Sequence, residues 1–157
     1  MAHPAIIEAF WQKYLKTLPA DIASPAPIFE VWHFCDNQQD ADELGELASR
    51  GIKTATASAL WAYTADEPLP QVGSLSVITN WNGDPLLLVE STEVEIVPFN
   101  QVSPRQAYDE GEGDRSLATW REAHWLAFGR DLQALGKEPA EDMPVVCEHF
   151  RILYRSS

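Results

Sequence analysis

A single lysine stands among hydroxyl-bearing residues near the middle of the chain. Lys53 is followed by Thr54, Thr56 and Ser58, and no other lysine or arginine occurs from residue 54 to residue 104. A solitary ammonium beside hydroxyls can bind an anion, or it can act as a base after losing its proton in a desolvated site. A surface lysine behind a helix end is the simpler interpretation, so the spacing alone leaves the role of Lys53 open.

A run of acidic residues further along the chain offers a second kind of chemistry. Glu110, Glu112 and Asp114 follow one another at every second position. Neighbouring carboxylates can hold a divalent cation, although this spacing does not match a calcium-binding loop. Solvated loop acids are the alternative interpretation. His124 lies on the same helix face as Trp120, which favours a hydrogen-bonded core histidine over a metal ligand.

These residues fall in three blocks that together resemble the ASCH domain, a PUA-like β-barrel family linked to RNA. The blocks are Gly51-x-Lys53-x-x-Thr56, then residues 110–117 followed by Trp120-Arg121 and His124-Trp125, and finally Cys147-Glu148-x-Phe150. The resemblance covers roughly residues 28–155. It implies an α+β fold, a small PUA-like barrel with flanking helices over residues 28–157, preceded by an N-terminal helix and loop over residues 1–27 that pack on the barrel.

The resemblance implies two different reactions. Small bacterial members with a similar first block are amidohydrolases of N4-acylated cytidines that use a lysine, a threonine and a glutamate. Carried over by motif, these are Lys53, Thr56 and Glu112, with Glu110 as the other candidate for the glutamate. Longer members are described as ribonucleases of single-stranded RNA, and this chain has their length and their Gly-Asp-Arg-Ser block. A non-catalytic nucleoside- or RNA-binding module is a third alternative.

The required chemistry favours the amidohydrolase. Amide hydrolysis needs a nucleophile, a proton acceptor and an oxyanion stabiliser. Thr56 would attack or orient a water, Lys53 would take the proton, and Glu112 would orient Lys53 or protonate the leaving group, with no cofactor or metal. Ribonuclease action would instead hold a charged lysine against a phosphate, and the net charge of −13 disfavours such contacts. We therefore expect a small nucleoside as the partner, with short single-stranded RNA as the alternative.

Aromatic side chains near these segments are expected to hold the base. Stacking on an aromatic side chain is worth about 1–3 kcal/mol per base. We expect the pocket between residues 53–61 and the loop 108–116. The expected substrate-binding residues are Thr54, Ser58, Trp61, Tyr63, Tyr108, Glu110 and Arg115. Trp61 and Trp120 could instead fill the core, and this interpretation is favoured for Trp120.

The composition indicates one globular domain. The chain has 157 residues, 45% of them hydrophobic, and six tryptophans, which is enough for a sizeable core. Cys35 and Cys147 lie in apolar runs that are expected to be strands, so we expect buried free thiols and a reducing cytoplasm. The sequence shows neither a signal peptide nor a stretch of transmembrane length, so we expect no membrane partner.

The hydrophobic pattern predicts the elements that must position these residues. Helices are expected at about 5–17, 40–50, 57–63 and 116–135, with a short one starting at Ser103-Pro104; strands are expected at 28–35, 74–81, 85–97 and 145–154. Asn82-Gly83 favours a tight hairpin, and Gly51 lies where a helix end needs a left-handed residue. His33 is expected to be a partly buried strand residue.

Overall fold

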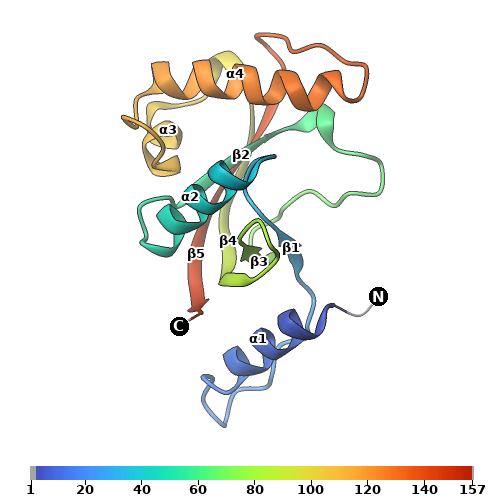
Figure 1. Ribbon diagram of the computed structural model, residues 1–157, viewed down its shortest axis with the longest axis vertical. Coiled ribbons are helices and arrows are strands. Elements are labelled where there is room, and N and C mark those ends of the chain that lie inside the picture. The colour runs from blue at the N-terminus through green and yellow to red at the C-terminus, as the bar shows by residue number, and fades with distance from the viewer. Residues whose placement is uncertain (1–2, 157) are drawn as a thin grey trace.

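Five strands form one curled sheet in the computed structural model, which describes residues 3–156 (Figure 1). The strands are β1 (Glu30–Trp32), β2 (Ala55–Ala59), β3 (Leu75–Thr79), β4 (Pro85–Pro98) and β5 (Pro144–Arg155). The helices are α1 (Ala5–Leu15), α2 (Gln38–Ser49), α3 (Pro104–Glu110) and α4 (Leu117–Gln133), with 3₁₀ turns η1 (Leu60–Ala62) and η2 (Phe99–Gln101).

The strand order β1-β3-β4-β5-β2 leaves β1 and β2 at the two edges of the sheet. β1 pairs in parallel with β3, and the other neighbours are antiparallel. The pairing of β4 with β5 shifts register at Leu88/Val89 and at Ser91/Glu93. Such irregularities bend a strand and increase its twist, so they help to curl this sheet into a half-barrel.

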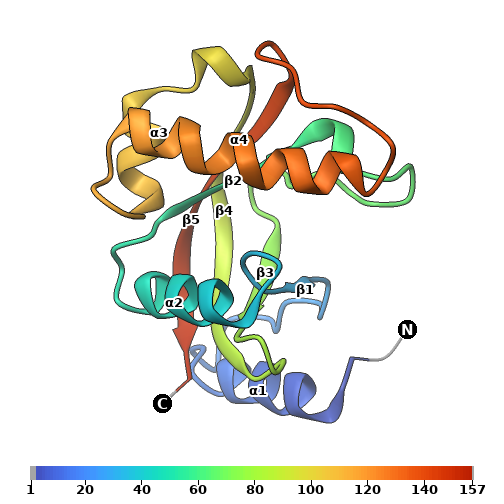
Figure 2. The same ribbon diagram turned by 45° about the horizontal axis from the view of Figure 1, so that its top comes forward.

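Three hydrophobic clusters attach the helices to the sheet. α1 buries Ile7, Phe10 and Trp11 against β3 and β4, while α2 packs over Ile78 and Leu87. A third cluster lies under α4 and contains Phe99, Trp120, Phe128, Leu132, Met143 and Val145. Figure 2 shows the result, with α4 crossing one end of the sheet and α1 at the opposite end. Burying each large side chain contributes about 1.5–3 kcal/mol.

No helix in the described part of the chain is long and apolar enough to span a membrane.

The predicted helix over 57–63 is wrong, because this segment forms β2 and then η1. β2 pairs with β5 over its whole length. Its alternation places Ala59 in the cluster under α4, while Thr56 and Ser58 face the other side of the sheet. Small residues carry little strand propensity of their own, so the long-range pairing decides the structure.

The first strand is shorter than expected, and the loop of the hairpin is longer. β1 ends at Trp32, so His33 lies beyond the strand and is exposed, which corrects the prediction of a partly buried strand residue. Cys35 follows with a φ of 57° and is exposed, whereas Cys147 is buried as expected. At the hairpin, β3 stops at Thr79, and the Asn80 and Asp84 backbone groups close a longer loop.

Candidate functional site

Lys53 is buried between two carboxylates, so the interpretation as a surface lysine is wrong. Its side chain is 1% exposed, and its Nζ lies 2.8 Å from Glu112 Oε2 and 3.6 Å from Glu110 Oε1. The ammonium also lies 4.9 Å from the centre of the Phe34 ring. A buried ammonium is tolerated only when it is paired and hydrogen-bonded. These contacts fix Lys53 in one place.

Two glycines bring the lysine and the carboxylates together. Gly51, with a φ of 75°, follows α2 as expected, and the Ile52 and Lys53 amides donate to the Leu47 carbonyl beyond it. Gly111, with a φ of 72°, follows α3, and a Cβ atom there would lie 2.8 Å from the Ile52 carbonyl oxygen. Only glycine allows this close approach. The end of α3 therefore packs directly against the segment that carries Lys53.

Glu110 is the centre of a buried polar network. It is 1% exposed, and its Oε2 accepts hydrogen bonds from Trp120 Nε1 and, at 3.2 Å, from Gln106 Nε2. Burial alone would raise the pKa of Glu110, but the charge of Lys53 and the contact with His124 outweigh it and hold this pKa below its usual value. Glu110 is therefore an ionised carboxylate at neutral pH.

His124 joins this network beside Glu110. Its Nδ1 donates to the Trp120 carbonyl at 2.8 Å, and its Nε2 lies 3.3 Å from Glu110 Oε1. Burial lowers the pKa of His124, but the neighbouring Glu110 more than offsets this and raises it. The histidine is hydrogen-bonded, as the sequence indicated, and its side chain is 13% exposed.

The same residues form the group that comes nearest to a metal site in the described part of the chain. One ligand atom each from Glu110, Glu112 and His124 lies within 4.8 Å of the others. The Lys53 ammonium already contacts both carboxylates, however, and Asp114 is used elsewhere, because its Oδ1 accepts from the Ser116 amide at the start of α4. The donor set fits an internal ammonium better than a divalent cation.

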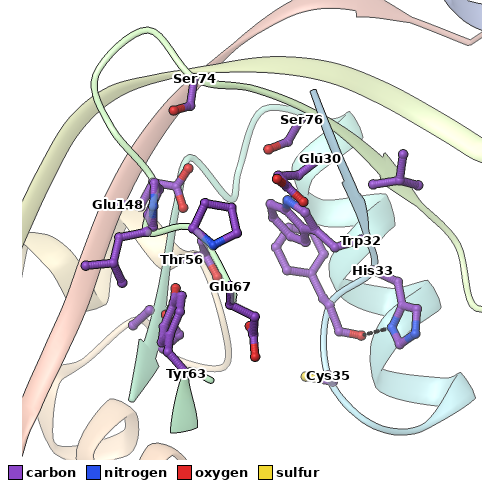
Figure 3. Close-up of a pocket in the computed structure, with 17 residues that line it drawn as sticks. Glu30, Trp32, His33, Cys35, Thr56, Tyr63, Glu67, Ser74, Ser76 and Glu148 are labelled. Carbon is purple, nitrogen blue, oxygen red and sulfur yellow. Dashed lines mark hydrogen bonds between the residues drawn. The ribbon is translucent and has the colours of Figure 1, made fainter. Parts of the chain in front are cut away.

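A cavity of about 480 Å³ lies on the concave side of the sheet, between its two edge strands (Figure 3). Its lining comprises residues 30–35 from β1 and the following turn, 56–58 from β2, Tyr63, residues 67–70, Ser74, Ser76 and Glu148. Trp32 lies on one side of the space, and Tyr63 and Glu148 lie on the other. Because β1 and β2 do not pair, the half-barrel is open where this cavity forms.

The lining of the cavity is acidic. It includes Glu30, Glu67 and Glu148, and it contains no lysine or arginine. Carboxylates repel phosphates and accept hydrogen bonds from N–H and O–H groups. Partial desolvation and the charge of Glu112 raise the pKa of Cys35 to about 11, so this thiol stays protonated at neutral pH. Hydroxyl groups are therefore the nucleophiles that the lining offers, on Thr56 and Ser58 from β2 and on Ser74 and Ser76.

Residues 30–154 match the ASCH domain family. The chain belongs to the ASCH domain family. It is 38% identical to an ASCH domain from Lactobacillus crispatus JV V101, with a TM-score of 0.91 over 99% of this chain and 98% of that one. It is 34% identical to protein EF3133 from Enterococcus faecalis V583, with a TM-score of 0.81 over 94% of this chain and 87% of that one. No curated protein matches the chain.

These similarities confirm the predicted fold, an α+β ASCH domain with a curled sheet and flanking helices. Among the residues expected at its site, Thr56, Ser58 and Tyr63 line the cavity, and Tyr63 shares a hydrogen bond of 2.8 Å with Ser58. Lys53 does not line the cavity. The Phe34 ring, which contacts the Lys53 ammonium, lies in the lining and separates it from the cavity.

The other expected residues do not line this cavity. Thr54 bonds to the Asp109 carbonyl, and Trp61, 39% exposed, accepts from Lys137 through its own carbonyl. Tyr108 is exposed and stacks on the Arg115 guanidinium, 3.6 Å from its ring centre. Trp120 fills the core under α4, as the favoured interpretation held, and residues 108–116 contribute nothing to the lining.

Several cavity residues of the ASCH domain were missed at the level of the sequence, among them Trp32 and Glu148. Trp32 belongs to an aromatic run whose inward face depends on how the sheet curls, so no local signal identifies it. Glu148 carried a signal, since it is a glutamate that directly follows the apolar run Val145-Val146-Cys147. It is 8% exposed, and burial raises its pKa, although a hydrogen bond from Ser91 lowers it in part.

Proposed function

We propose that this ASCH domain is an amidohydrolase that removes acyl groups from N4-acylated cytidine nucleosides. The observation that carries the proposal is the cavity of about 480 Å³, which has Thr56 in its wall and no lysine or arginine in its lining. Cavities of about 300–1,000 Å³ are typical of sites for small molecules. An uncharged nucleoside is compatible with this acidic lining, whereas an RNA chain would bring phosphates close to Glu30, Glu67 and Glu148.

The reaction assigns one role to each of three residues. Thr56 Oγ1, or a water that it orients, attacks the acyl carbon, and the bond from that carbon to N4 breaks. The Lys53–Glu112 pair, joined at 2.8 Å, lies behind the Phe34 ring, so it takes the proton of the attacking group and returns one to N4 through a bridging water. The positive charge of the Lys53 ammonium favours the oxyanion that forms on the acyl oxygen. Water completes the reaction, and the products are cytidine and the carboxylic acid.

The proposal is tested by incubating the protein with N4-acetylcytidine and, separately, with a labelled single-stranded RNA. We expect free cytidine and acetate in the first reaction, intact RNA in the second, and the same rate when a chelator is present. Lys53→Ala is expected to stop the release of cytidine. Lys13 is an exposed lysine of α1, so Lys13→Ala is the matched control and is expected to keep the activity. Shortened RNA without release of cytidine would reject the proposal in favour of a ribonuclease. Binding of RNA or nucleoside without turnover would favour a non-catalytic module, which is also compatible with the family.

A further inference from the structure

Glu148 is held in the cavity wall directly opposite Thr56. The register of β2 and β5 pairs these two residues, and opposite residues in an antiparallel pair project to the same face with Cβ atoms about 4.5–5.5 Å apart. Ser91 on β4 donates to Glu148 Oε1 at 2.5 Å and fixes the orientation of the carboxyl group. Three adjacent strands therefore position this one side chain.

The surroundings of Glu148 supply little to balance its charge. Within residues 3–156, no lysine, arginine or histidine forms an ion pair with it, and no hydrogen bond to its Oε2 is found. No buried side-chain oxygen within residues 3–156 lacks a hydrogen-bond partner, so Oε2 is open to the cavity and not enclosed in the protein. The cavity that Glu148 lines is large enough to bring a donor to this oxygen. The arrangement fits a ligand that presents an N–H group.

The opposite side of the cavity provides a flat surface. Trp32 lies across the space from Glu148, with Ser76 near it (Figure 3). An aromatic ring on one side and an oriented acceptor on the other fit a planar heterocycle that stacks by its face and is recognised at its edge.

We propose that Glu148 selects a base that carries an exocyclic amine, by accepting a hydrogen bond from the amine N–H at Oε2. The inference rests on the proposed function for the identity of the base, an aminopyrimidine. A uracil base presents a carbonyl oxygen at the same position, so two acceptors would face each other. Because Thr56 is opposite Glu148, an amine held at Glu148 presents its acyl substituent to the Thr56 hydroxyl.

The test compares the binding of cytidine and uridine by calorimetry to the wild-type protein and to Glu148→Gln. We expect the wild type to prefer cytidine by roughly 10- to 100-fold, as befits a hydrogen bond to a charged group. A glutamine can turn its NH₂ toward a carbonyl, so Glu148→Gln is expected to abolish or reverse this preference. Glu67→Gln, at an exposed carboxylate of the same lining, is the matched control and is expected to keep it.

Unchanged preference in Glu148→Gln, or no binding of cytidine to the wild type, would overturn the inference. If Glu148→Gln does not fold, Ser91→Ala takes its place, because it removes the hydrogen bond that orients the Glu148 carboxylate. Ser91→Ala is expected to reduce the preference for cytidine several-fold, and an unchanged preference in this variant would also overturn the inference. Binding and hydrolysis are measured separately. A preference that depends on Glu148 in a protein that releases no cytidine would reject the proposed function alone, while hydrolysis with a preference independent of Glu148 would reject this inference alone.

Discussion

Glu110 and Glu148 are both buried carboxylates, and they differ in what surrounds them. Glu110 has Lys53 at 3.6 Å, His124 at 3.3 Å and a hydrogen bond from Trp120. Glu148 has one hydroxyl partner, Ser91, and an open cavity. The first carboxylate is neutralised by the protein itself, which suits a group that holds other groups in place. The second faces an open cavity, so we propose that the first region positions other groups and the second recognises a ligand.

Neutralising each carboxylate in turn should give the largest difference between the two regions. Glu110→Gln leaves His124 and Lys53 with fewer partners, and breaking a buried ion pair costs about 3–5 kcal/mol. Glu148→Gln removes no cation and keeps an acceptor for Ser91, so its cost is expected to stay below about 1 kcal/mol. Urea unfolding measures both free energies. Equal losses in the two variants would show that the regions do not differ in this way.

A double substitution separates catalysis from folding at the Lys53–Glu112 pair. Lys53→Met leaves two carboxylates without their ammonium and should both unfold more easily and lose turnover. Adding Glu112→Gln removes one of those charges, so Lys53→Met/Glu112→Gln is expected to regain much of the lost stability. Its turnover should remain about 10²–10⁴-fold down, the usual contribution of a proton-transferring group. Turnover that returned together with stability would mean that Lys53 serves only the fold.

Two aromatic residues test where the base stacks. Trp32 lines the cavity, whereas Tyr108 is exposed and stacks on Arg115 outside it. Trp32→Ala is expected to weaken cytidine binding by about 1–3 kcal/mol, the value of one stacking contact. Tyr108→Ala is expected to leave it unchanged. The reverse pattern, measured by fluorescence titration, would move the ligand to the loop 108–116.

The two carboxylates should also respond to pH in opposite directions. The pKa of Glu110 is lowered by Lys53 and His124, so its contribution to stability is present above its unfolded value of 4.5 and is lost as the pH falls below that value. The pKa of Glu148 is raised by burial, so the folded state loses stability as the pH rises through 4.5 and upward. The penalty of Glu110→Gln should therefore shrink as the pH falls from 4.5 toward about 2, and Glu148→Gln should gain stability relative to the wild type as the pH rises above 4.5. The free energies of unfolding of both variants and the wild type are measured in urea at several pH values. The same pH dependence for the two variants would contradict the assignment.

Much of the fold was readable from local signals. Asn37, Ser103 and Ser116 cap their helices through side-chain oxygens, and Gly51 takes the left-handed conformation expected of it. β2 was not readable, because its small residues become a strand only through pairing with β5. Lys53 stood out by its isolation in the sequence, and its partners by their acidic run.

The cavity itself could not be predicted in the same way. Its walls come from the two edges of the sheet, and which side chains face inward depends on how far the sheet curls. Trp32 and Glu148 are brought opposite each other only by that curvature. The sequence placed the pocket between the Lys53 segment and the loop 108–116. Glu110 and Glu112 of that loop do contact Lys53, but they lie behind the cavity wall.

The most direct test of the account is the release of cytidine from N4-acetylcytidine by the wild-type protein and by Thr56→Val. Valine keeps the branched shape and the strand preference of threonine and replaces the hydroxyl with a methyl group, so the fold should be retained. We expect the wild type to release cytidine and acetate, Thr56→Val to release neither at a measurable rate, and Thr56→Ser to keep partial activity. Release by Thr56→Val at the wild-type rate would contradict the central claim that the cavity is an active site built on Thr56.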